Sequence, residues 1–197
     1  MTTQAEVPVK WKVSGSPLNT RETLRMATFP RKDSSAYKMA LEFLQGLFSI
    51  LVLQGPAGTG KTGLAIAIAW EYLEKGLSVR YGQVEEVLDG WRQLYDRAPG
   101  EALDFEGVFR GWKDSPLTVL DDLGAGRLTE WAEVKVTALI DYRWLRGLPL
   151  VVTLNEPLDT LPPRVADRLA DAEKGRVGLM VGESLRRARP SQVGGRR

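Results

Sequence analysis

The fold is decided by the stretch Gly55-Pro56-Ala57-Gly58-Thr59-Gly60-Lys61-Thr62, which fits the G-x-x-x-x-G-K-[ST] pattern of a phosphate-binding P-loop. An apolar run over 50–53 precedes it and is typical of a buried strand, and a helix-forming run over 64–70 follows it. Strand, loop and helix in this order are the context that the pattern requires. The sequence therefore predicts a phosphate-binding loop between the first core strand and its helix.

The residue types of this loop suit the phosphates of a nucleoside triphosphate. Glycines allow successive backbone N–H groups to point inward, and the helix that begins near Lys61 adds the positive end of its dipole. Lys61 is predicted to reach the β- and γ-phosphates, and the Thr62 hydroxyl is predicted to ligate Mg²⁺. We expect ATP and Mg²⁺ as cofactors, with ATP bound by Gly55, Pro56, Ala57, Gly58, Thr59, Gly60, Lys61, Thr62 and Gly63.

The composition limits the chemistry that is available. The chain has 197 residues, enough for one domain, and it contains neither Cys nor His. Disulfides, thiolate or imidazole metal ligands, Ser-His-Asp catalysis and histidine general bases are therefore excluded. A catalytic proton acceptor must be a carboxylate, a lysine or a tyrosine.

Charge and hydropathy favour a cytoplasmic protein that does not act in a membrane. No stretch approaches the length of a transmembrane span, and Met1-Thr2-Thr3-Gln4 lacks the pattern of a signal peptide. The net charge is only +2, but basic residues gather near the C-terminus, at Arg186, Arg187, Arg189, Arg196 and Arg197. We expect residues 188–197 to form a basic, disordered tail; the alternative is a contact to nucleic-acid phosphates.

Apolar runs alternate with helical patterns along the chain. Strands are predicted over 49–54, 78–81, 117–120, 150–153 and 177–181. Helices are predicted over 35–48, from the P-loop to 75, and over 84–96, 103–112, 130–146 and 163–172, with one face of the first formed by Ala40, Leu41, Leu44 and Leu47. This alternation indicates a parallel sheet covered on both faces. The predicted fold is α/β, a P-loop NTPase with a five-stranded parallel sheet flanked by helices.

Polar residues follow three of these strands, where ligands bind in such a sheet. Asp121 and Asp122 come after four apolar or β-branched residues and form a Walker B pattern. Asp121 is predicted to hold Mg²⁺, directly or through water, and Asp122 to orient or deprotonate the attacking water. Asn155 is predicted to position that water or to sense the γ-phosphate. The alternatives are two acids that cap a turn, and an Asx turn at Asn155 before Pro157.

Arginines and aromatic residues give weaker signals. Arg164, Arg168 and Arg186 are candidates to stabilise transition-state charge, from the same chain or from a neighbour, and surface ion pairing is the alternative for each. Five aromatic residues are candidates to stack on bases, although packing explains such residues more often: Trp91, Tyr95, Trp112, Trp131 and Trp144.

Several short motifs together resemble one family, the AAA+ ATPases of the DnaC/DnaI helicase-loader and IstB transposition-helper group. The most specific motifs are Leu120-Asp121-Asp122-Leu123-Gly124 and Gly182-Glu183-Ser184-Leu185-Arg186. Between them, in the family's order, stand Thr129-Glu130-Trp131, Arg143-Trp144, Leu148-Pro149, Thr153-Leu154-Asn155 and Arg164-Val165-Ala166-Asp167-Arg168-Leu169. The resemblance implies an ASCE-type AAA+ ATPase domain over 31–187, with a minimal or absent lid, after a peripheral segment 1–30.

The resemblance also implies roles for single residues. Asn155 is similar to sensor 1 and Arg186 to sensor 2, whereas Arg168 is similar to the arginine finger, with Arg164 as the second candidate. Because the finger acts in trans in this family, the resemblance implies self-association into ATP-dependent oligomers. It further implies a replicative helicase as client and single-stranded DNA near the oligomer axis.

Three functions are compatible with these residues. The first is a DnaC-like helicase loader that hydrolyses ATP with Lys61, Asp122, Asn155, Arg168 and Arg186. The second keeps the ATPase but acts on a transposase, as an IstB-like transposition helper. The third is an ATP-binding switch or scaffold with little hydrolysis, because Asp122 is shorter than the glutamate that many AAA+ proteins have at this position.

Overall fold

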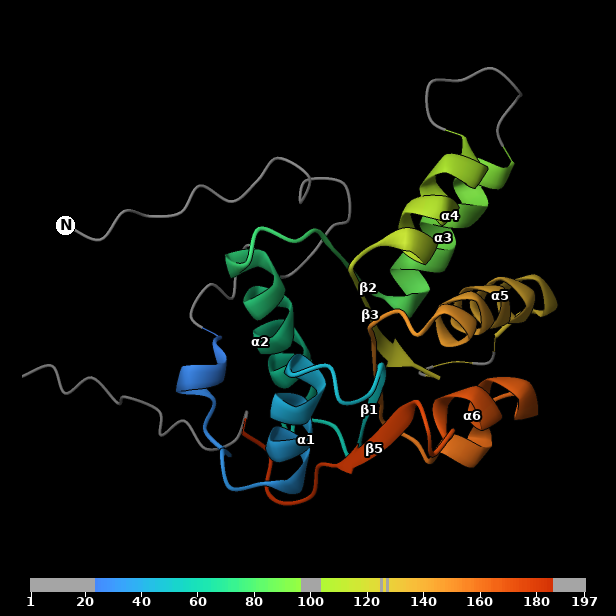
Figure 1. Cartoon of the computed structure of the whole chain (residues 1–197). Coiled ribbons are helices and arrows are strands. Elements are labelled where there is room, and N and C mark those ends of the chain that lie inside the picture. Colours follow the sequence, from blue (N-terminus) through green and yellow to red (C-terminus); the bar gives the residue numbers. More distant parts are fainter. Residues whose placement is uncertain (1–23, 97–103, 125, 127, 186–197) are drawn as a thin grey trace, which may run out of the picture.

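A computed structural model describes residues 24–96, 104–124, 126 and 128–185 of the chain (Figure 1). Arg186, the tail 188–197 and most of the segment 1–30 lie outside the described residues, so the predictions made for them stay predictions. We keep the division into 1–30, 31–187 and 188–197 as a proposal. Within the described part of the first segment, Met26 and Phe29 are buried in the core.

A parallel sheet of five strands forms the centre of the fold, in the order β2-β3-β4-β1-β5. Its strands are β1 (Ile50–Gln54), β2 (Val79–Gln83), β3 (Leu117–Leu123), β4 (Leu150–Leu154) and β5 (Gly175–Leu179). The helices are α1 (Ser35–Leu44), α2 (Lys61–Glu74), α3 (Val84–Tyr95), α4 (Phe105–Asp114), α5 (Glu130–Arg146) and α6 (Pro163–Leu169), with 3-10 turns η3 (Met26–Thr28) and η4 (Leu158–Thr160). The predicted α/β class and five-stranded parallel sheet are confirmed.

Helices cover both faces of this sheet, as its continuous apolar strands require. Along β1, Leu51 and Leu53 face one core cluster with α1 and α2, and Ile50 and Val52 face a second cluster with α3, α4, α5 and α6. Figure 1 shows the same division of helices between the two sides of the sheet. Because β4 lies between β1 and β3, the carboxyl ends of these three strands meet at one edge of the sheet.

Several predicted bounds are wrong in detail. Helix α1 ends at Leu44 instead of residue 48, because Gly46 turns the chain with φ +78° and the Leu47 N–H donates to the Glu42 carbonyl, which closes the helix. Its predicted apolar face is right only in part: Ala40 is buried and Leu44 packs against the core, but Leu41 is 40% and Leu47 65% exposed. The buried face of α1 is completed by Ala36, Tyr37 and Phe43.

Strand β5 covers 175–179 instead of 177–181. Its pairing with β1 begins where Gly175 lies opposite Ile50. A Cβ on Gly175 would stand 2.8 Å from the Leu169 carbonyl oxygen, so the strand starts at a glycine because the chain passes α6 closely there. The apolar run alone gave no sign of this start. Strand β3 is also longer than predicted and includes Asp121 and Asp122.

A buried arginine, Arg143, connects the segments at the amino edge of the sheet, opposite the carboxyl ends of the strands. The Arg143 guanidinium is fully buried and donates to the carbonyl oxygens of Trp112 (3.0 Å), Lys113 (2.8 Å), Ser115 (2.9 Å) and Pro149 (2.6 Å). Burial lowers the pKa of Arg143 to about 10, so it stays charged at neutral pH. It thereby joins the loops that enter β3 and β4.

Over the described residues, no helix has the length and apolar character to span a bilayer.

We expect Arg143→Lys to lower the free energy of unfolding by about 3 kcal/mol, because a single ammonium cannot satisfy four separate carbonyls and buried acceptors would lose their donors. Urea unfolding followed by circular dichroism measures the loss. Arg146→Lys, at the exposed end of the same helix, is the matched control and should change the value by less than about 0.5 kcal/mol. Equal losses in the two variants would contradict this role of Arg143.

Candidate functional site

The P-loop lies between β1 and α2, where the sequence predicts it. Gly60 has φ +103° and caps α2, so the first turn of the helix begins at Lys61. Inside the loop the Thr59 hydroxyl donates to the Pro56 carbonyl at 2.9 Å, and the Gly55 N–H donates to the Leu154 carbonyl of β4 at 3.1 Å. These bonds fix the loop at the carboxyl edge of the sheet, with the positive end of the α2 dipole beside it.

Lys61 points back into the loop. Its side chain is buried, and the ammonium donates to the carbonyl oxygens of Gly55 at 2.6 Å and Pro56 at 2.8 Å. A cation is therefore held where the loop would receive phosphate oxygens.

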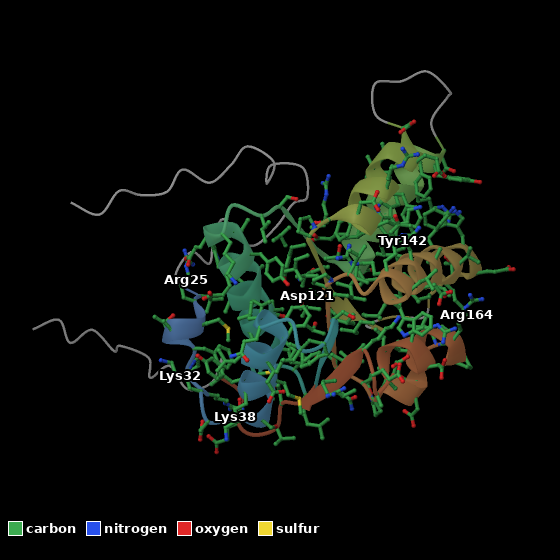
Figure 2. The ribbon with its side chains drawn as sticks, in the orientation of Figure 1. Arg25, Lys32, Lys38, Asp121, Tyr142 and Arg164 are labelled. Atoms are coloured by element: carbon green, nitrogen blue, oxygen red, sulfur yellow. The ribbon has the colours of Figure 1, made fainter. Side chains whose placement is uncertain are left out.

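Asp121 connects the P-loop with the rest of the site. Its buried carboxylate accepts the Thr62 hydroxyl at 3.0 Å and the Thr153 hydroxyl at 2.7 Å on Oδ1, and the Tyr81 hydroxyl at 2.6 Å on Oδ2. Figure 2 shows Asp121 near the centre of the molecule, beside α2. The oxygen atoms of Asp121 and Thr62 are hard donors, which fit the preference of Mg²⁺.

Asp122 turns away from the regular strand. It is the one non-glycine residue with positive φ (+61°) in the described part of the chain, and the pairing of β3 with β4 is irregular between Leu120 and Leu123. Its N–H donates to the Thr153 hydroxyl at 2.8 Å, and its Oδ1 accepts a hydrogen bond from the Asn155 side-chain amide. Asp122 also borders a hollow of about 210 Å³ between α3 and α5. The two residues predicted to handle water thus contact each other.

The two candidate finger arginines lie elsewhere, around Asp141 of α5, which belongs to the sheet face opposite α2. Arg164 pairs with Asp141 at 2.5 Å and its side chain is 67% exposed. Arg168 pairs with Asp141 at 3.1 Å and with Asp167 at 2.8 Å, and its guanidinium lies 4.1 Å from the ring centre of Trp144. In the described part of the chain these arginines form their ion pairs with Asp141 and Asp167 and not with residues of the P-loop, and Figure 2 shows Arg164 on the side of the molecule away from α2.

A segment that we call the strap, residues 180–185, packs against the P-loop. The Leu185 N–H donates to the Gly58 carbonyl at 2.8 Å. A Cβ on Gly58, which has φ +86°, would stand 2.2 Å from the Ser184 hydroxyl oxygen. Arg31 fixes the strap from outside by donating to the carbonyl oxygens of Val181, at 2.8 Å, and Glu183. Arg186 directly follows the strap but lies outside the described residues.

Sequence reasoning missed Tyr81 and Arg31. Tyr81 belonged to a short strand with no motif, and Arg31 lies 150 residues from Val181. Thr153 was part of a recognised motif, but no role was given to it. Of the aromatic residues considered for base stacking, Trp91 and Trp112 are buried and contact each other, whereas Tyr95 is 55% exposed.

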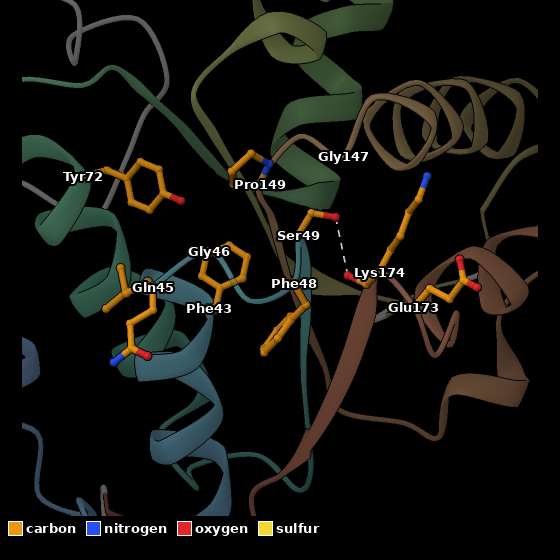
Figure 3. Close-up of a pocket in the computed structure, with 11 residues that line it drawn as sticks. Phe43, Gln45, Gly46, Phe48, Ser49, Tyr72, Gly147, Pro149, Glu173 and Lys174 are labelled. Carbon is orange, nitrogen blue, oxygen red and sulfur yellow. Dashed lines mark hydrogen bonds between the residues drawn. The ribbon is translucent and has the colours of Figure 1, made fainter.

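A second hollow was also not predicted. It has a volume of about 410 Å³ and is lined by Phe43, Phe48 and Tyr72, and by the residues just before three strands, Ser49, Pro149 and Lys174 (Figure 3). It therefore lies at the amino edge of the sheet, opposite the P-loop. Burial raises the pKa of the Tyr72 hydroxyl there.

Several curated proteins align with this chain, and among them are two replicative helicase loaders. The replicative helicase loader DnaC of Escherichia coli K12 is 22% identical over 137 residues, which cover 70% of this chain and 55% of DnaC. The replicative helicase loader DnaI of Bacillus subtilis 168 is 32% identical over 112 residues, which cover 56% of this chain and 34% of DnaI. The chain thus spans about half, or less, of the length of these relatives.

A solved structure agrees in fold. The crystal structure of the DnaC helicase loader matches with a TM-score of 0.68 at 20% identity, over 81% of this chain and 97% of that one. The family model described as IstB-like ATP binding protein matches residues 21–176, which include the P-loop, Asp121, Asp122 and Asn155. The chain therefore belongs to the IstB-like ATP-binding family, in the AAA+ group that includes the DnaC and DnaI helicase loaders.

Proposed function

We propose that this protein is a Mg²⁺-dependent ATPase that acts on DNA-bound assemblies as a DnaC-like helicase loader. The observation that carries the proposal is the continuous hydrogen-bonded connection at one edge of the sheet. It runs from Thr62 of the P-loop through Asp121 and Thr153 to Asp122 and Asn155. These residues supply the cation-binding oxygens, the carboxylate and the amide that phosphoryl transfer to water requires.

Lys61 is proposed to bind the β- and γ-phosphates. Its ammonium already donates to two loop carbonyls, and phosphate oxygens, which carry full charge, are stronger acceptors than these. We propose that ATP replaces the carbonyls as the partner of Lys61. The loop would contribute backbone N–H groups and the α2 dipole.

Thr62 and Asp121 are proposed to hold Mg²⁺, which neutralises charge on the phosphates when it is bound. Asp122 is proposed to orient a water molecule and accept its proton, because it is a carboxylate beside an open hollow. Asn155 holds Oδ1 of Asp122, which fixes the direction of the carboxylate.

The choice of client rests on two of the relatives, DnaC and DnaI, which are both named replicative helicase loaders. A transposition helper is the second candidate, which the IstB family description favours. Retention of a replicative helicase, rather than a transposase, on the immobilised protein with ATP distinguishes the two. Single-stranded DNA and a homo-oligomer are the further proposed partners.

We expect Lys61→Ala to weaken ATP binding about 10–100-fold, because charge-assisted hydrogen bonds to the phosphates are lost. Isothermal titration calorimetry with ATP and Mg²⁺ measures the affinity. Lys75→Ala, at the exposed end of the same helix, should bind like the unaltered protein. Absence of ATP binding in the unaltered protein would refute the proposed function.

Asp122→Asn should retain ATP binding but lower the rate of phosphate release about 100-fold, since an amide cannot accept the proton from water. Asp159→Asn, an exposed aspartate in η4, is the control and should keep the full rate. If the unaltered protein releases phosphate no faster than Asp122→Asn, the ATP-binding switch becomes the better description.

The arginine finger is tested by mixing inactive variants. We propose Arg168 for this role, with Arg164 as the second candidate because its side chain is more exposed. Arg168→Ala should lower ATP turnover at least about 100-fold, and addition of Lys61→Ala protein should restore part of it. The restored rate would come from interfaces that combine an intact P-loop with an intact arginine. The same mixture is then made with Arg164→Ala protein in place of Arg168→Ala protein. If Lys61→Ala protein restores turnover to Arg164→Ala but not to Arg168→Ala, the arginine finger is assigned to Arg164 instead.

A further inference from the structure

Tyr81 contacts the proposed metal ligand from the strand next to it. It lies on β2 opposite Val119 of β3, only 1% exposed, and its ring packs in the core cluster beneath α2. Its hydroxyl extends along the sheet and donates to Oδ2 of Asp121 at 2.6 Å. The ring of Tyr81 thus packs in the core, and its hydroxyl contacts the Asp121 carboxylate.

The two carboxylate oxygens of Asp121 have different surroundings. Oδ1 accepts the hydroxyls of Thr62 and Thr153, and Oδ2 accepts the hydroxyl of Tyr81. Oδ1 therefore faces the P-loop threonine, and Oδ2 is engaged by β2. A carboxylate engaged at both oxygens cannot rotate freely, so Tyr81 helps to fix the plane of the Asp121 carboxylate.

We propose that Tyr81 is a positioning residue for the magnesium site: it fixes the plane of the Asp121 carboxylate so that one of its oxygens stays beside the Thr62 hydroxyl, and these two groups would hold Mg²⁺. This inference rests on the proposed function. The Thr62 hydroxyl could bind a metal ion through its oxygen and still donate to Oδ1, while Tyr81 and Thr153 would hold the carboxylate in place. Loss of a residue that hydrogen-bonds to a metal ligand commonly lowers the affinity for the metal by about 10–100-fold.

Tyr81→Phe removes the hydroxyl and keeps the ring. Mg²⁺ is expected to raise the affinity for ATP, and the half-effect concentration is the Mg²⁺ concentration that gives half of this increase. We expect Tyr81→Phe to raise the half-effect concentration about tenfold and to leave the ATP affinity measured in EDTA unchanged. Calorimetric ATP titrations at a series of Mg²⁺ concentrations measure this. The rate of phosphate release should return to that of the unaltered protein at saturating Mg²⁺, because Tyr81 does not contact the reacting atoms.

The matched control is Tyr37→Phe. Tyr37 is buried in the same core cluster, and its hydroxyl donates to the Met26 carbonyl at 3.0 Å, away from Asp121. A structural role for a buried hydroxyl would lower the unfolding midpoint in both variants, but only the proposed role shifts the Mg²⁺ dependence, and only in Tyr81→Phe.

An unchanged Mg²⁺ dependence in folded Tyr81→Phe would overturn the inference and leave the ATPase proposal intact. Failure of the unaltered protein to bind ATP would instead reject the proposed function itself. If Tyr81→Phe does not fold, Tyr81→Met takes its place, because methionine adapts to irregular core space. Misfolding of both variants would also overturn the inference, since the hydroxyl would then serve the fold.

Discussion

The site depends on one buried carboxylate. Removing Asp121 from water is costly unless its oxygens find donors, and three hydroxyls from three elements supply them: Thr62 of α2, Tyr81 of β2 and Thr153 of β4. Each donor can reach Asp121 only if its own element has the correct position relative to β3. The requirement to satisfy this carboxylate therefore fixes the start of α2 and the two neighbours of β3 at the same point.

The P-loop satisfies a second constraint, which comes from the chain itself. The strap passes so close that a side chain on Gly58 would collide with Ser184, and the ammonium of Lys61 is bonded to carbonyls of its own loop. Phosphate affinity is thus the difference between new phosphate contacts and the internal contacts that they replace. Arg31 binds the carbonyls of the strap and thereby links the segment before α1 to the strap beside the P-loop.

Local patterns could be predicted from the sequence, and contacts between distant segments could not. The bounds of α5 agree with the prediction because Thr129 caps its first turn and Gly147 ends it with φ +61°, both of which are local signals. The P-loop and the Asp121-Asp122 pair can be recognised in the sequence because a phosphate-binding loop requires a fixed spacing and the two acids follow an apolar strand directly. Tyr81 and Asp121 are 40 residues apart, and no spacing rule joins them. The prediction that Leu41 and Leu47 are buried is wrong, because apolar character alone does not determine which face of α1 meets the sheet.

The backbone at Asp122 explains how two adjacent acids lie in one hydrogen-bonded network. In a regular strand, successive side chains point to opposite faces of the sheet, so Asp121 and Asp122 would be separated by the sheet itself. The irregular pairing between Leu120 and Leu123, with φ +61° at Asp122, interrupts this alternation. Aspartate tolerates such a conformation better than most residues, at a cost of about 1 kcal/mol or more. The bonds from its N–H to Thr153 and from Asn155 to its carboxylate offset that cost, and they keep Asp122 at the edge where Asp121 already faces Thr62.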